Sequence, residues 1–248
     1  MTQPADERRP IIETQALVKS YGLLLVLRKL DLTISRGEFV ALLGPNGSGK
    51  STLLRLLAGL SRPSSGRILV GGWELPREAA AVRAQIGMVS HQSLLYESLT
   101  AYENLKFFAR LYDLPAASMD ERIMAMLARV GLKKRAYDLA GTFSRGMTQR
   151  LSIARALIHD PHVLLLDEPY TGLDQDAGYT LDELLAAAHA DGHTIVMTTH
   201  QLDRAAQLAD RVLILTRGRV GYDQSAAALD TLTLAADYAR ITEMAAAR

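Results

Sequence analysis

Residues 44–51 are Gly44-Pro45-Asn46-Gly47-Ser48-Gly49-Lys50-Ser51, which match the pattern G-x-x-x-x-G-K-[ST] of a phosphate-binding loop. The apolar residues 38–43 just before this loop predict a buried parallel strand, and residues 50–60 predict a helix with leucines on one face. Glycines let successive backbone N–H groups point into one concavity, and the helix N-terminus adds the positive end of its dipole. A glycine-rich connection can match the pattern by chance, but the strand and helix on the required sides favour a nucleotide-phosphate site.

A second element supplies the acidic groups that such a site needs. Residues 163–168 read Val-Leu-Leu-Leu-Asp-Glu, an apolar strand that ends in two carboxylates. The strand delivers Asp167 next to the Mg²⁺ that the Ser51 hydroxyl holds, and Glu168 is placed to polarise a water against the γ-phosphate, while Lys50 reaches the β- and γ-phosphates. Both elements together predict nucleoside triphosphate hydrolysis or transfer. The nucleotide-binding residues expected in the loop are Gly44, Pro45, Asn46, Gly47, Ser48, Gly49, Lys50, Ser51 and Thr52.

Composition excludes several other classes of protein. The chain has 248 residues, of which 48% are apolar and 22% charged, as is typical of a globular protein. Twenty-eight Lys and Arg against 27 Asp and Glu leave a net charge of +1, so nucleic acid is not expected as a partner. The absence of cysteine excludes disulfides, thiolate catalysis and iron–sulfur clusters on this chain. The apolar runs are far shorter than the ~20 residues of a spanning helix, so a role at a membrane requires another protein that spans it.

The order of the remaining patterns predicts an α/β fold. Strands are expected at residues 11–19, 30–34, 38–43, 67–70 and 86–90, and again at 163–166, 194–198 and 211–215. The middle of the chain is helical, since Thr100 with Glu103 and Ser118 with Glu121 have the spacing of capping boxes. They predict helices at residues 101–113 and 119–130, and Ser144 is expected to cap a third helix that runs to residue 159. A parallel sheet with an inserted helical subdomain fits this order.

The loop Phe143-Ser144-Arg145-Gly146-Met147 lies before an apolar helix and shortly ahead of the Asp167 strand. At this point the chain resembles the ATP-binding-cassette (ABC) ATPases, which carry a signature loop usually written L-S-G-G-Q. Ser144 and Gly146 match that pattern, whereas Arg145 and Met147 depart from it. The resemblance implies that the Ser144 hydroxyl and the Gly146 backbone N–H contact a γ-phosphate. A plain helix N-cap is the alternative interpretation of this stretch.

Four further positions match the same family in order along the chain. The resemblance implies that Tyr21 stacks on adenine and that Gln92 reaches Mg²⁺ and the attacking water. It further implies that Asp174 belongs to the loop that crosses to the other subunit, and that His200 contacts the γ-phosphate. Tyr21 is alternatively a core or edge-strand tyrosine. Asp174 is alternatively, or in addition, a helix N-cap.

The fold that the resemblance implies is a P-loop NTPase with a RecA-like core, an antiparallel β lobe and an inserted helical subdomain. We expect one ABC ATPase domain at residues 11–222 with the helical subdomain at about 99–155, a flexible N-terminus at 1–10 and a helical tail at 223–248. In this family the signature loop closes over the nucleotide of the opposite subunit. Because the chain holds one phosphate loop and one signature loop, two copies are expected to meet head to tail around two ATP molecules.

Most single-cassette chains of this length energise a membrane transporter, so the expected partners are integral membrane subunits at the cytoplasmic face. The surface at residues 93–98 is the expected place for their coupling helix. Within the family, residues 94–105, 143–147 and 154–161 look most like the haem-exporter ATPase of cytochrome c maturation and its exporter relatives. The alternatives are the ATPase of a drug, lipid or polysaccharide exporter and a soluble ABC ATPase of iron–sulfur cluster assembly. A two-cassette factor and a monomeric P-loop kinase fit the motifs less well.

Overall fold

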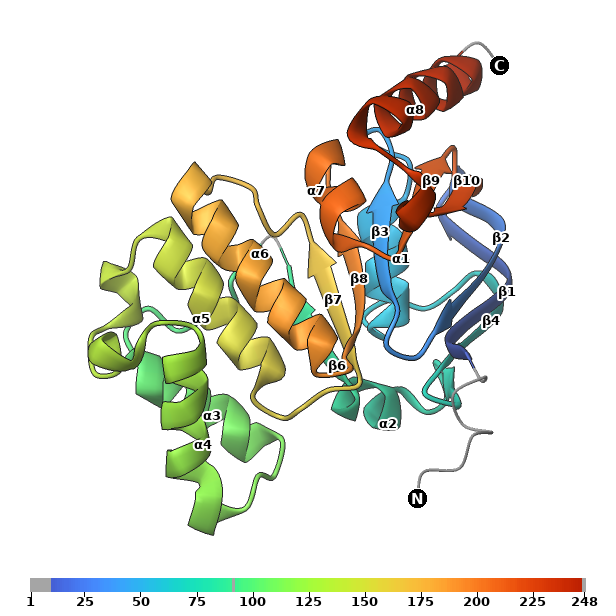
Figure 1. The fold of residues 1–248 in the computed structure, drawn as a ribbon. Helices are drawn as coiled ribbons and strands as arrows, with labels where there is room; N and C mark the ends of the chain where they lie inside the picture. Colours follow the sequence, from blue (N-terminus) through green and yellow to red (C-terminus); the bar gives the residue numbers. More distant parts are fainter. Residues whose placement is uncertain (1–9, 91, 247–248) are drawn as a thin grey trace, which may run out of the picture.

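The computed structural model describes residues 10–90 and 92–246, which form two β-sheets flanked by helices (Figure 1). The central sheet has the strand order β10-β9-β3-β8-β7-β6, and its neighbours run parallel except in the hairpin β9–β10. A smaller antiparallel sheet has the order β2-β1-β4-β5. The strands are β1 (Pro10–Tyr21), β2 (Leu24–Ser35), β3 (Phe39–Leu43), β4 (Ser65–Val70), β5 (Trp73–Leu75), β6 (Ile86–Val89), β7 (Val163–Asp167), β8 (Thr194–Thr198), β9 (Arg211–Thr216) and β10 (Arg219–Ser225).

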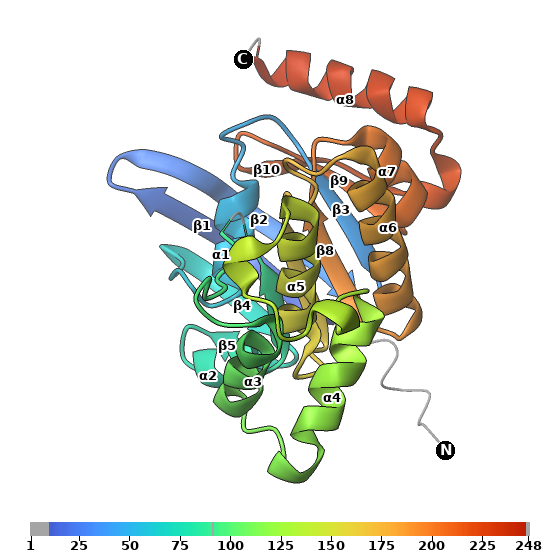
Figure 2. The ribbon, with the colours of Figure 1, turned by 90° about the vertical axis from the view of Figure 1, so that its left-hand side faces the viewer.

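Helices cover both faces of the central sheet, with α1 on one face and α6 and α7 on the other (Figures 1 and 2). The helices α3 and α4 lie at the far side of α5 and form a separate layer beside the sheet. Short 3-10 turns occur at Lys133–Arg135, Ala140–Thr142 and Ala226–Ala228. The helices are α1 (Lys50–Leu57), α2 (Ala79–Ala84), α3 (Ala101–Leu111), α4 (Ala116–Arg129), α5 (Arg145–Leu157), α6 (Gln175–Ala190), α7 (Leu202–Leu208) and α8 (Thr231–Ala246).

Strand alternation divides the interior into two cores. In β3, Val40 and Leu42 pack with α1 and the antiparallel sheet, whereas Phe39, Ala41 and Leu43 pack with α5, α6 and α7. Successive side chains of a strand point to opposite faces, so a strand covered on both sides must be apolar throughout. All five residues of β3 are buried. The expected α/β fold with a parallel sheet, an antiparallel lobe and a helical insert is confirmed.

The antiparallel lobe is longer than the sequence pattern predicted. The strand expected at residues 30–34 begins at Leu24, because β2 pairs with β1 from Tyr21↔Leu24 to Pro10↔Ser35. In its second half, Leu30, Leu32 and Ile34 are buried in the alternation that the sequence indicated. The first half has no such alternation, since Leu24 and Leu25 are exposed near the hairpin tip. Pairing with β1, rather than a buried face, therefore makes this half a strand.

The two capping boxes have different outcomes. Thr100 caps α3 as predicted, since its hydroxyl accepts from the Glu103 N–H and the Glu103 carboxylate accepts from the Thr100 N–H. The Ser118 box is wrong, because α4 starts at Ala116, directly after Pro115, and Ser118 lies inside the helix. The fixed φ of proline prepares the chain for a helix start, so no side-chain cap is needed there. Ser144 caps α5, whose Met147 N–H donates to the Ser144 hydroxyl.

Strands cross both ends of the expected domain. The proposed flexible N-terminus, residues 1–10, lies outside the described residues except for Pro10, which begins β1. The last strand, β10, runs to Ser225 and crosses the boundary expected at 222, because Gln224 and Ser225 still pair with β9. Beyond it, α8 lies across one end of the sheet and buries Leu234 against the second core (Figure 2). The division into a domain at 11–222 and a tail at 223–248 stays a prediction.

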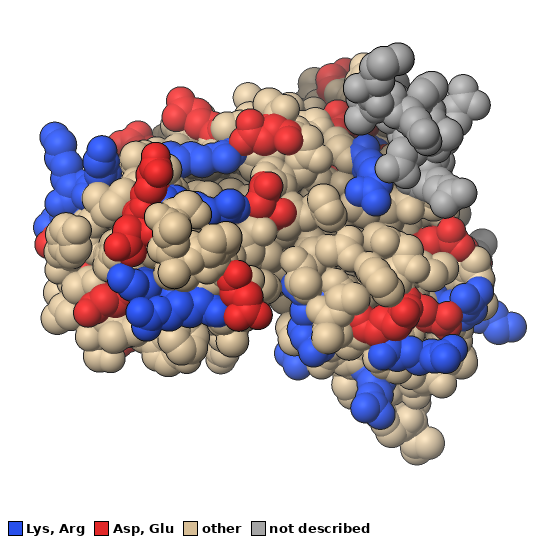
Figure 3. Space-filling view, turned by 90° about the horizontal axis from the view of Figure 1, so that it is seen from below, with Lys and Arg blue, Asp and Glu red and all other residues tan. Residues whose placement is uncertain are grey.

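The surface carries charges of both signs. On the face seen in Figure 3, Lys and Arg side chains are interspersed with Asp and Glu. Some of the surface charges of opposite sign form ion pairs, for example Arg67 with Glu74 and Lys106 with Asp120. Among residues 10–90 and 92–246, none of the helices has the length and apolar character that crossing a bilayer demands.

Candidate nucleotide-binding site

The phosphate loop lies between β3, which ends at Leu43, and α1, which begins at Lys50, as predicted. Gly44 and Gly49 both have a positive φ, at 142° and 110°. A Cβ on Gly44 would lie 2.2 Å from the Leu215 carbonyl oxygen, and one on Gly49 would lie 2.8 Å from the Leu27 side chain. Backbone conformation and close packing therefore both require glycine at these two positions.

Lys50 is buried within the loop that precedes it. Its ammonium group donates to the carbonyl oxygens of Gly44, at 2.7 Å, and Pro45, at 3.2 Å. Burial lowers the pKa of Lys50, while the nearby charges of Glu168 and Asp167 partly offset this effect. Hydrogen bonds between ionised partners are stronger than those to neutral carbonyls. The ammonium group is thus held close to the loop and available to an anionic phosphate.

Asp167 and Ser51 meet at the end of β7. The Ser51 hydroxyl donates to Asp167 Oδ1 at 3.0 Å, and the Thr198 hydroxyl donates to the same oxygen at 2.8 Å. Hydroxyl and carboxylate oxygens are the ligands that Mg²⁺ prefers, so this pair fits the cation that the loop implies. Thr198 was missed by the sequence analysis, although it ends the strand that leads to His200.

Glu168 and His200 face each other across the same region. His200 Nε2 lies 2.9 Å from Glu168 Oε1. Glu168 has a positive φ of 51°, and its backbone N–H donates to both the carbonyl and the hydroxyl oxygen of Thr198. Burial raises the pKa of the Glu168 carboxyl, and the charges of His200 and Lys50 oppose this. A carboxylate with a raised pKa is better suited to accept a proton from water.

Lys50, Ser51, Glu168 and His200 line one cavity of about 410 Å³, here called the phosphate-loop cavity, and Asp167 adjoins it through its hydrogen bond with Ser51. Tyr21, the last residue of β1, lies at its rim with 49% of its surface exposed, and Lys19 Nζ lies 4.6 Å from the centre of its ring. Leu24 and Val26 of β2 add an apolar wall beside Tyr21. Neither was predicted, since the apolar run of the hairpin carried no motif. An aromatic ring next to an apolar wall suits a planar base.

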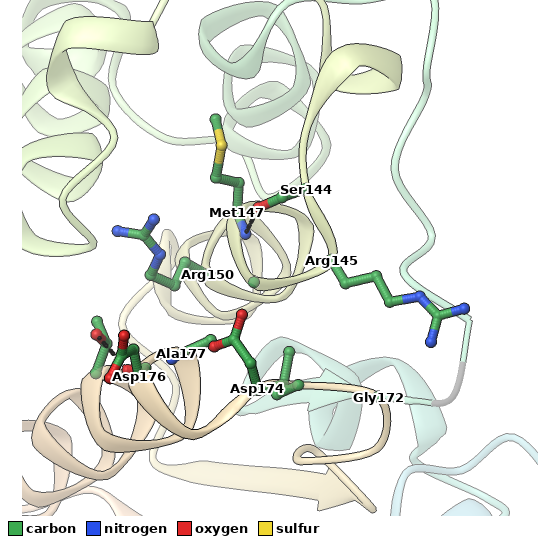
Figure 4. A pocket seen from close by; sticks show the side chains of 11 residues that line it. Ser144, Arg145, Met147, Arg150, Gly172, Asp174, Asp176 and Ala177 are labelled. Atoms are coloured by element: carbon green, nitrogen blue, oxygen red, sulfur yellow. Dashed lines mark hydrogen bonds between the residues drawn. The ribbon is translucent and has the colours of Figure 1, made fainter.

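A second cavity, of about 440 Å³, contains the predicted residues Ser144, Gly146 and Asp174 and is here called the signature cavity (Figure 4). Asp174 Oδ1 accepts from the Ala177 N–H at 2.8 Å, so Asp174 is the N-cap of α6, one of the roles predicted for it. Gly146 lies against α6, because a Cβ there would approach the Ala177 Cβ to 2.9 Å. Within the described residues, the two cavities have no lining residue in common.

Arg145, the residue that departs from the family pattern, extends away from Asp174 and Arg150 (Figure 4). Its guanidinium lies against Gly172, where a Cβ would come within 2.6 Å of Nη1. The side chain is exposed and makes no ion pair with any described residue. The guanidinium therefore does not cover the Ser144 hydroxyl.

Gln92 is not brought to the phosphate-loop cavity. Its carbonyl oxygen accepts from the Ser90 hydroxyl at 2.8 Å, just beyond the end of β6. Of the described residues, those that line the two cavities do not include it. The structure thus gathers Tyr21, most of the phosphate loop, Glu168 and His200 around one cavity, with Asp167 bonded to Ser51, whereas Gln92 and the signature residues do not line it.

Comparison with known proteins agrees with this geometry. The sequence model of the ABC transporter family matches residues 27–171. The Nod factor export ATP-binding protein I of Cupriavidus pinatubonensis is 38% identical over 216 residues, covering 87% of this chain and 66% of that protein. Its counterpart in Rhizobium johnstonii is 40% identical over 220 residues, covering 88% and 71%. The linearmycin resistance ATP-binding protein LnrL of Bacillus subtilis is 35% identical over 210 residues, covering 85% and 68%. The chain thus spans about two thirds of the length of these relatives.

Solved structures have the same fold. The protein cbiO1 of Clostridium perfringens, part of the ABC transporter complex cbiONQ, superposes with a TM-score of 0.81 at 31% identity, covering 88% of this chain and 90% of that one. The ATP-binding cassette MJ0796, in a dimeric post-hydrolysis state bound to ADP and Pi, gives 0.79 at 29% identity, covering 87% and 98%. The family model matches more than half of the chain, and the relatives and solved structures agree with it. The chain therefore belongs to the ABC transporter family and carries the ATPase cassette of that family.

Proposed function

We propose that this chain is the ATP-binding and ATP-hydrolysing subunit of an exporter and that it works as a head-to-tail pair of cassettes. The observation that carries this proposal is the separation of the two cavities. One cavity holds Lys50, Glu168 and His200, and the other holds Ser144 and Gly146. In a head-to-tail pair, each signature cavity covers the phosphate-loop cavity of the other copy. The dimeric form of the related cassette MJ0796 supports such a pair.

Each residue of the phosphate-loop cavity has a role in this proposal. Tyr21 and the apolar wall receive adenine, and Lys50 with the loop N–H groups receives the β- and γ-phosphates. Ser51 and Asp167 would hold Mg²⁺, which when bound neutralises phosphate charge, and Gln92 would join them after the loop behind β6 moves. Glu168 accepts the proton of the attacking water, and His200 contacts the γ-phosphate.

The signature residues act on the nucleotide of the partner copy. Ser144 lies at the N-terminus of α5, where unpaired backbone N–H groups and the helix dipole favour an anion. Gly146 adds a further backbone N–H in the first turn of α5. Asp174 starts α6 at the edge of the same cavity, where the segment after β7 reaches the partner. ATP bound between the two copies stabilises the closed pair, and hydrolysis releases it.

The relatives favour export as the process that the cassette drives. They are named for Nod factor export and for linearmycin resistance, which fits the alternative of another exporter. They do not support haem export, the more specific expectation from the sequence. The integral membrane subunits would dock at the surface of residues 93–98, where Leu94 and Tyr96 are exposed and the Tyr96 ring contacts Phe107 of α3. In this proposal the chain is a peripheral subunit at the cytoplasmic face of a membrane.

A complementation experiment tests the head-to-tail pair. Lys50→Ala and Ser144→Arg are each expected to abolish ATP hydrolysis on their own. In a mixed dimer, the Lys50 of one variant and the Ser144 of the other form one intact site, so a mixture should hydrolyse ATP in a steady-state phosphate-release assay. Mixing Lys50→Ala with Glu168→Gln is the matched control. Each change disables the phosphate-loop cavity of its own copy, so the mixed dimer has no intact site. Equal, negligible rates in both mixtures would argue against sites shared between copies.

A further inference from the structure

Three polar side chains, one buried and two largely buried, have no part in the roles proposed for the candidate site. Tyr170 belongs to the segment between β7 and α6, Asp182 to α6 and Arg204 to α7. Tyr170 is 5% exposed, and the side chains of Asp182 and Arg204 are 14% and 12% exposed. Buried charged groups of this kind are stable only when they are paired. We call these residues the Tyr170–Asp182–Arg204 triad.

Each member of the triad contacts the other two. The Tyr170 hydroxyl donates to Asp182 Oδ1 at 2.7 Å, and Arg204 Nη1 donates to the same oxygen at 3.1 Å. The Arg204 guanidinium carbon lies 4.1 Å from the centre of the Tyr170 ring. Burial and the Asp182 carboxylate raise the pKa of Tyr170, so its hydroxyl remains a donor. The three side chains form a closed network whose members depend on one another.

Gly178 makes room for this network. It lies one turn before Asp182 on α6, and a Cβ there would lie 2.3 Å from Arg204 Nη2 and 2.9 Å from its central carbon. Glycine inside a helix is less favourable than alanine. The absence of a side chain at Gly178 thus allows the guanidinium to lie across α6 and reach Asp182.

The triad joins the two segments that carry the reacting groups. Tyr170 is two residues after Glu168, and Arg204 is four residues after His200. The backbone of Glu168 is already fixed to β8 through Thr198, and its carboxylate lies 2.9 Å from His200 Nε2. On the His200 side, α7 begins two residues after His200 and carries Arg204. The triad therefore links this helix to the segment that follows Glu168.

We propose that Tyr170, Asp182 and Arg204 are positioning residues that hold the Glu168 and His200 segments in one relative arrangement. The inference rests on the proposed function, because it requires Glu168 and His200 to act on bound ATP. Loss of the triad then lowers the rate of hydrolysis with little effect on ATP affinity, since none of the three residues lines the phosphate-loop cavity. A network that only joined α6 to α7 would affect stability and leave the rate unchanged.

The test measures kcat and KM for ATP in the full chain with Mg²⁺. Tyr170→Phe keeps the ring over the guanidinium and removes one hydrogen bond, and we expect a kcat about threefold lower. Asp182→Asn and Arg204→Met are expected to lower kcat about tenfold, with KM changed less than about twofold. Arg204→Lys keeps the charge but lacks the planar group, so it should recover part of the rate. Arg211→Met is the control, because it breaks an ion pair with Asp223 far from the site and should lower the melting temperature without changing kcat.

Gly178→Ala gives a second, independent measurement. Its methyl group collides with the guanidinium and should reproduce the kcat loss of Arg204→Met. In the Arg204→Met background the collision is gone, so the same change should have no further effect on kcat. Unchanged kcat in Asp182→Asn and Gly178→Ala would overturn the proposal, as would equal Gly178→Ala effects in both backgrounds. ATP hydrolysis by the wild type and its loss in Lys50→Ala are measured first. If both are found, the proposed function holds, and an unchanged kcat in the triad variants then counts against the triad alone.

Discussion

The phosphate-loop cavity and the signature cavity are built from similar parts, a loop and the N-terminus of a helix that follows it. They differ in the charged groups around them. Lys50, Glu168 and His200 converge on the first cavity, with Asp167 at its base. In the signature cavity, the Ser144 hydroxyl and the Asp174 carboxylate each accept a hydrogen bond from their own helix.

One chain therefore carries the groups proposed to bind and hydrolyse ATP in its phosphate-loop cavity, and its signature cavity is proposed to act on the nucleotide of a second chain. The phosphate-loop cavity has groups for the base, the phosphates, the cation and the proton. The signature cavity offers the helix-terminal N–H groups of α5 and α6, and its charged lining residues, Arg145, Arg150, Asp174 and Asp176, include neither a lysine nor a histidine. Changes in the first cavity should therefore alter what a single chain binds, and changes in the second should alter only what two chains do together.

Lys50→Ala should reduce ATP hydrolysis by at least about 100-fold and weaken ATP binding, because it removes the charge nearest the β- and γ-phosphates. Steady-state phosphate release and binding of a fluorescent ATP analogue measure the two effects. Lys106→Ala, which breaks an exposed ion pair with Asp120, is the control and should change neither. Near-normal hydrolysis in Lys50→Ala would contradict the assignment of the phosphate loop.

Glu168→Gln should bind ATP normally and hydrolyse it at least about 100-fold more slowly, because an amide cannot accept the proton of water. The unhydrolysed ATP should then hold two copies together as a dimer, which light scattering with ATP and Mg²⁺ detects. The double variant Glu168→Gln/Ser144→Arg is the control, since the blocked signature should return it to the monomer. A Glu168→Gln variant that stays monomeric at high ATP would contradict the shared site.

Arg145→Gly should keep ATP hydrolysis within about tenfold of the wild type, which is ~1.4 kcal/mol of barrier. The guanidinium lies against Gly172 and away from Ser144, so its loss leaves the phosphate contact in place. Ser144→Arg, which puts the same bulk one residue earlier, should abolish hydrolysis. Assays of both variants side by side decide the point, and an inactive Arg145→Gly would mean that the guanidinium itself acts on the nucleotide.

The pH dependence should reflect the raised pKa of Glu168. Only its carboxylate form accepts a proton, so kcat should fall as the pH is lowered through a midpoint above the ordinary pKa of 4.5. The contribution of Glu168 to the free energy of unfolding changes with pH in the opposite direction. The partly buried carboxylate destabilises the fold above that midpoint, and the protonated form does not. Thermal unfolding should show Glu168→Gln to be more stable than the wild type at pH 8, with the gain disappearing as pH falls towards 4.5. A gain that stays constant with pH would exclude Glu168 as its source.

Elements whose signals are local could be predicted from the amino-acid sequence. The phosphate loop needs adjacent glycines and a lysine at fixed spacing, and the buried strand before it needs only apolar residues. The Thr100 box and the Ser144 cap were predictable for the same reason, because a cap and its partner lie within one turn. The family resemblance then assigned roles to Tyr21 and His200, which the structure places in one cavity.

Features that depend on residues far apart in the chain became visible only in the folded molecule. Leu24 begins a strand because β1 pairs with it, and α4 starts at Ala116 although Ser118 has the spacing of a cap. The side to which Arg145 points depends on Gly172, and the meeting of Asp182 with Arg204 depends on the missing side chain at Gly178. A side chain's hydrogen-bond partners and direction are set by what packs against it, and sequence spacing carries that information only within one helix or one hairpin.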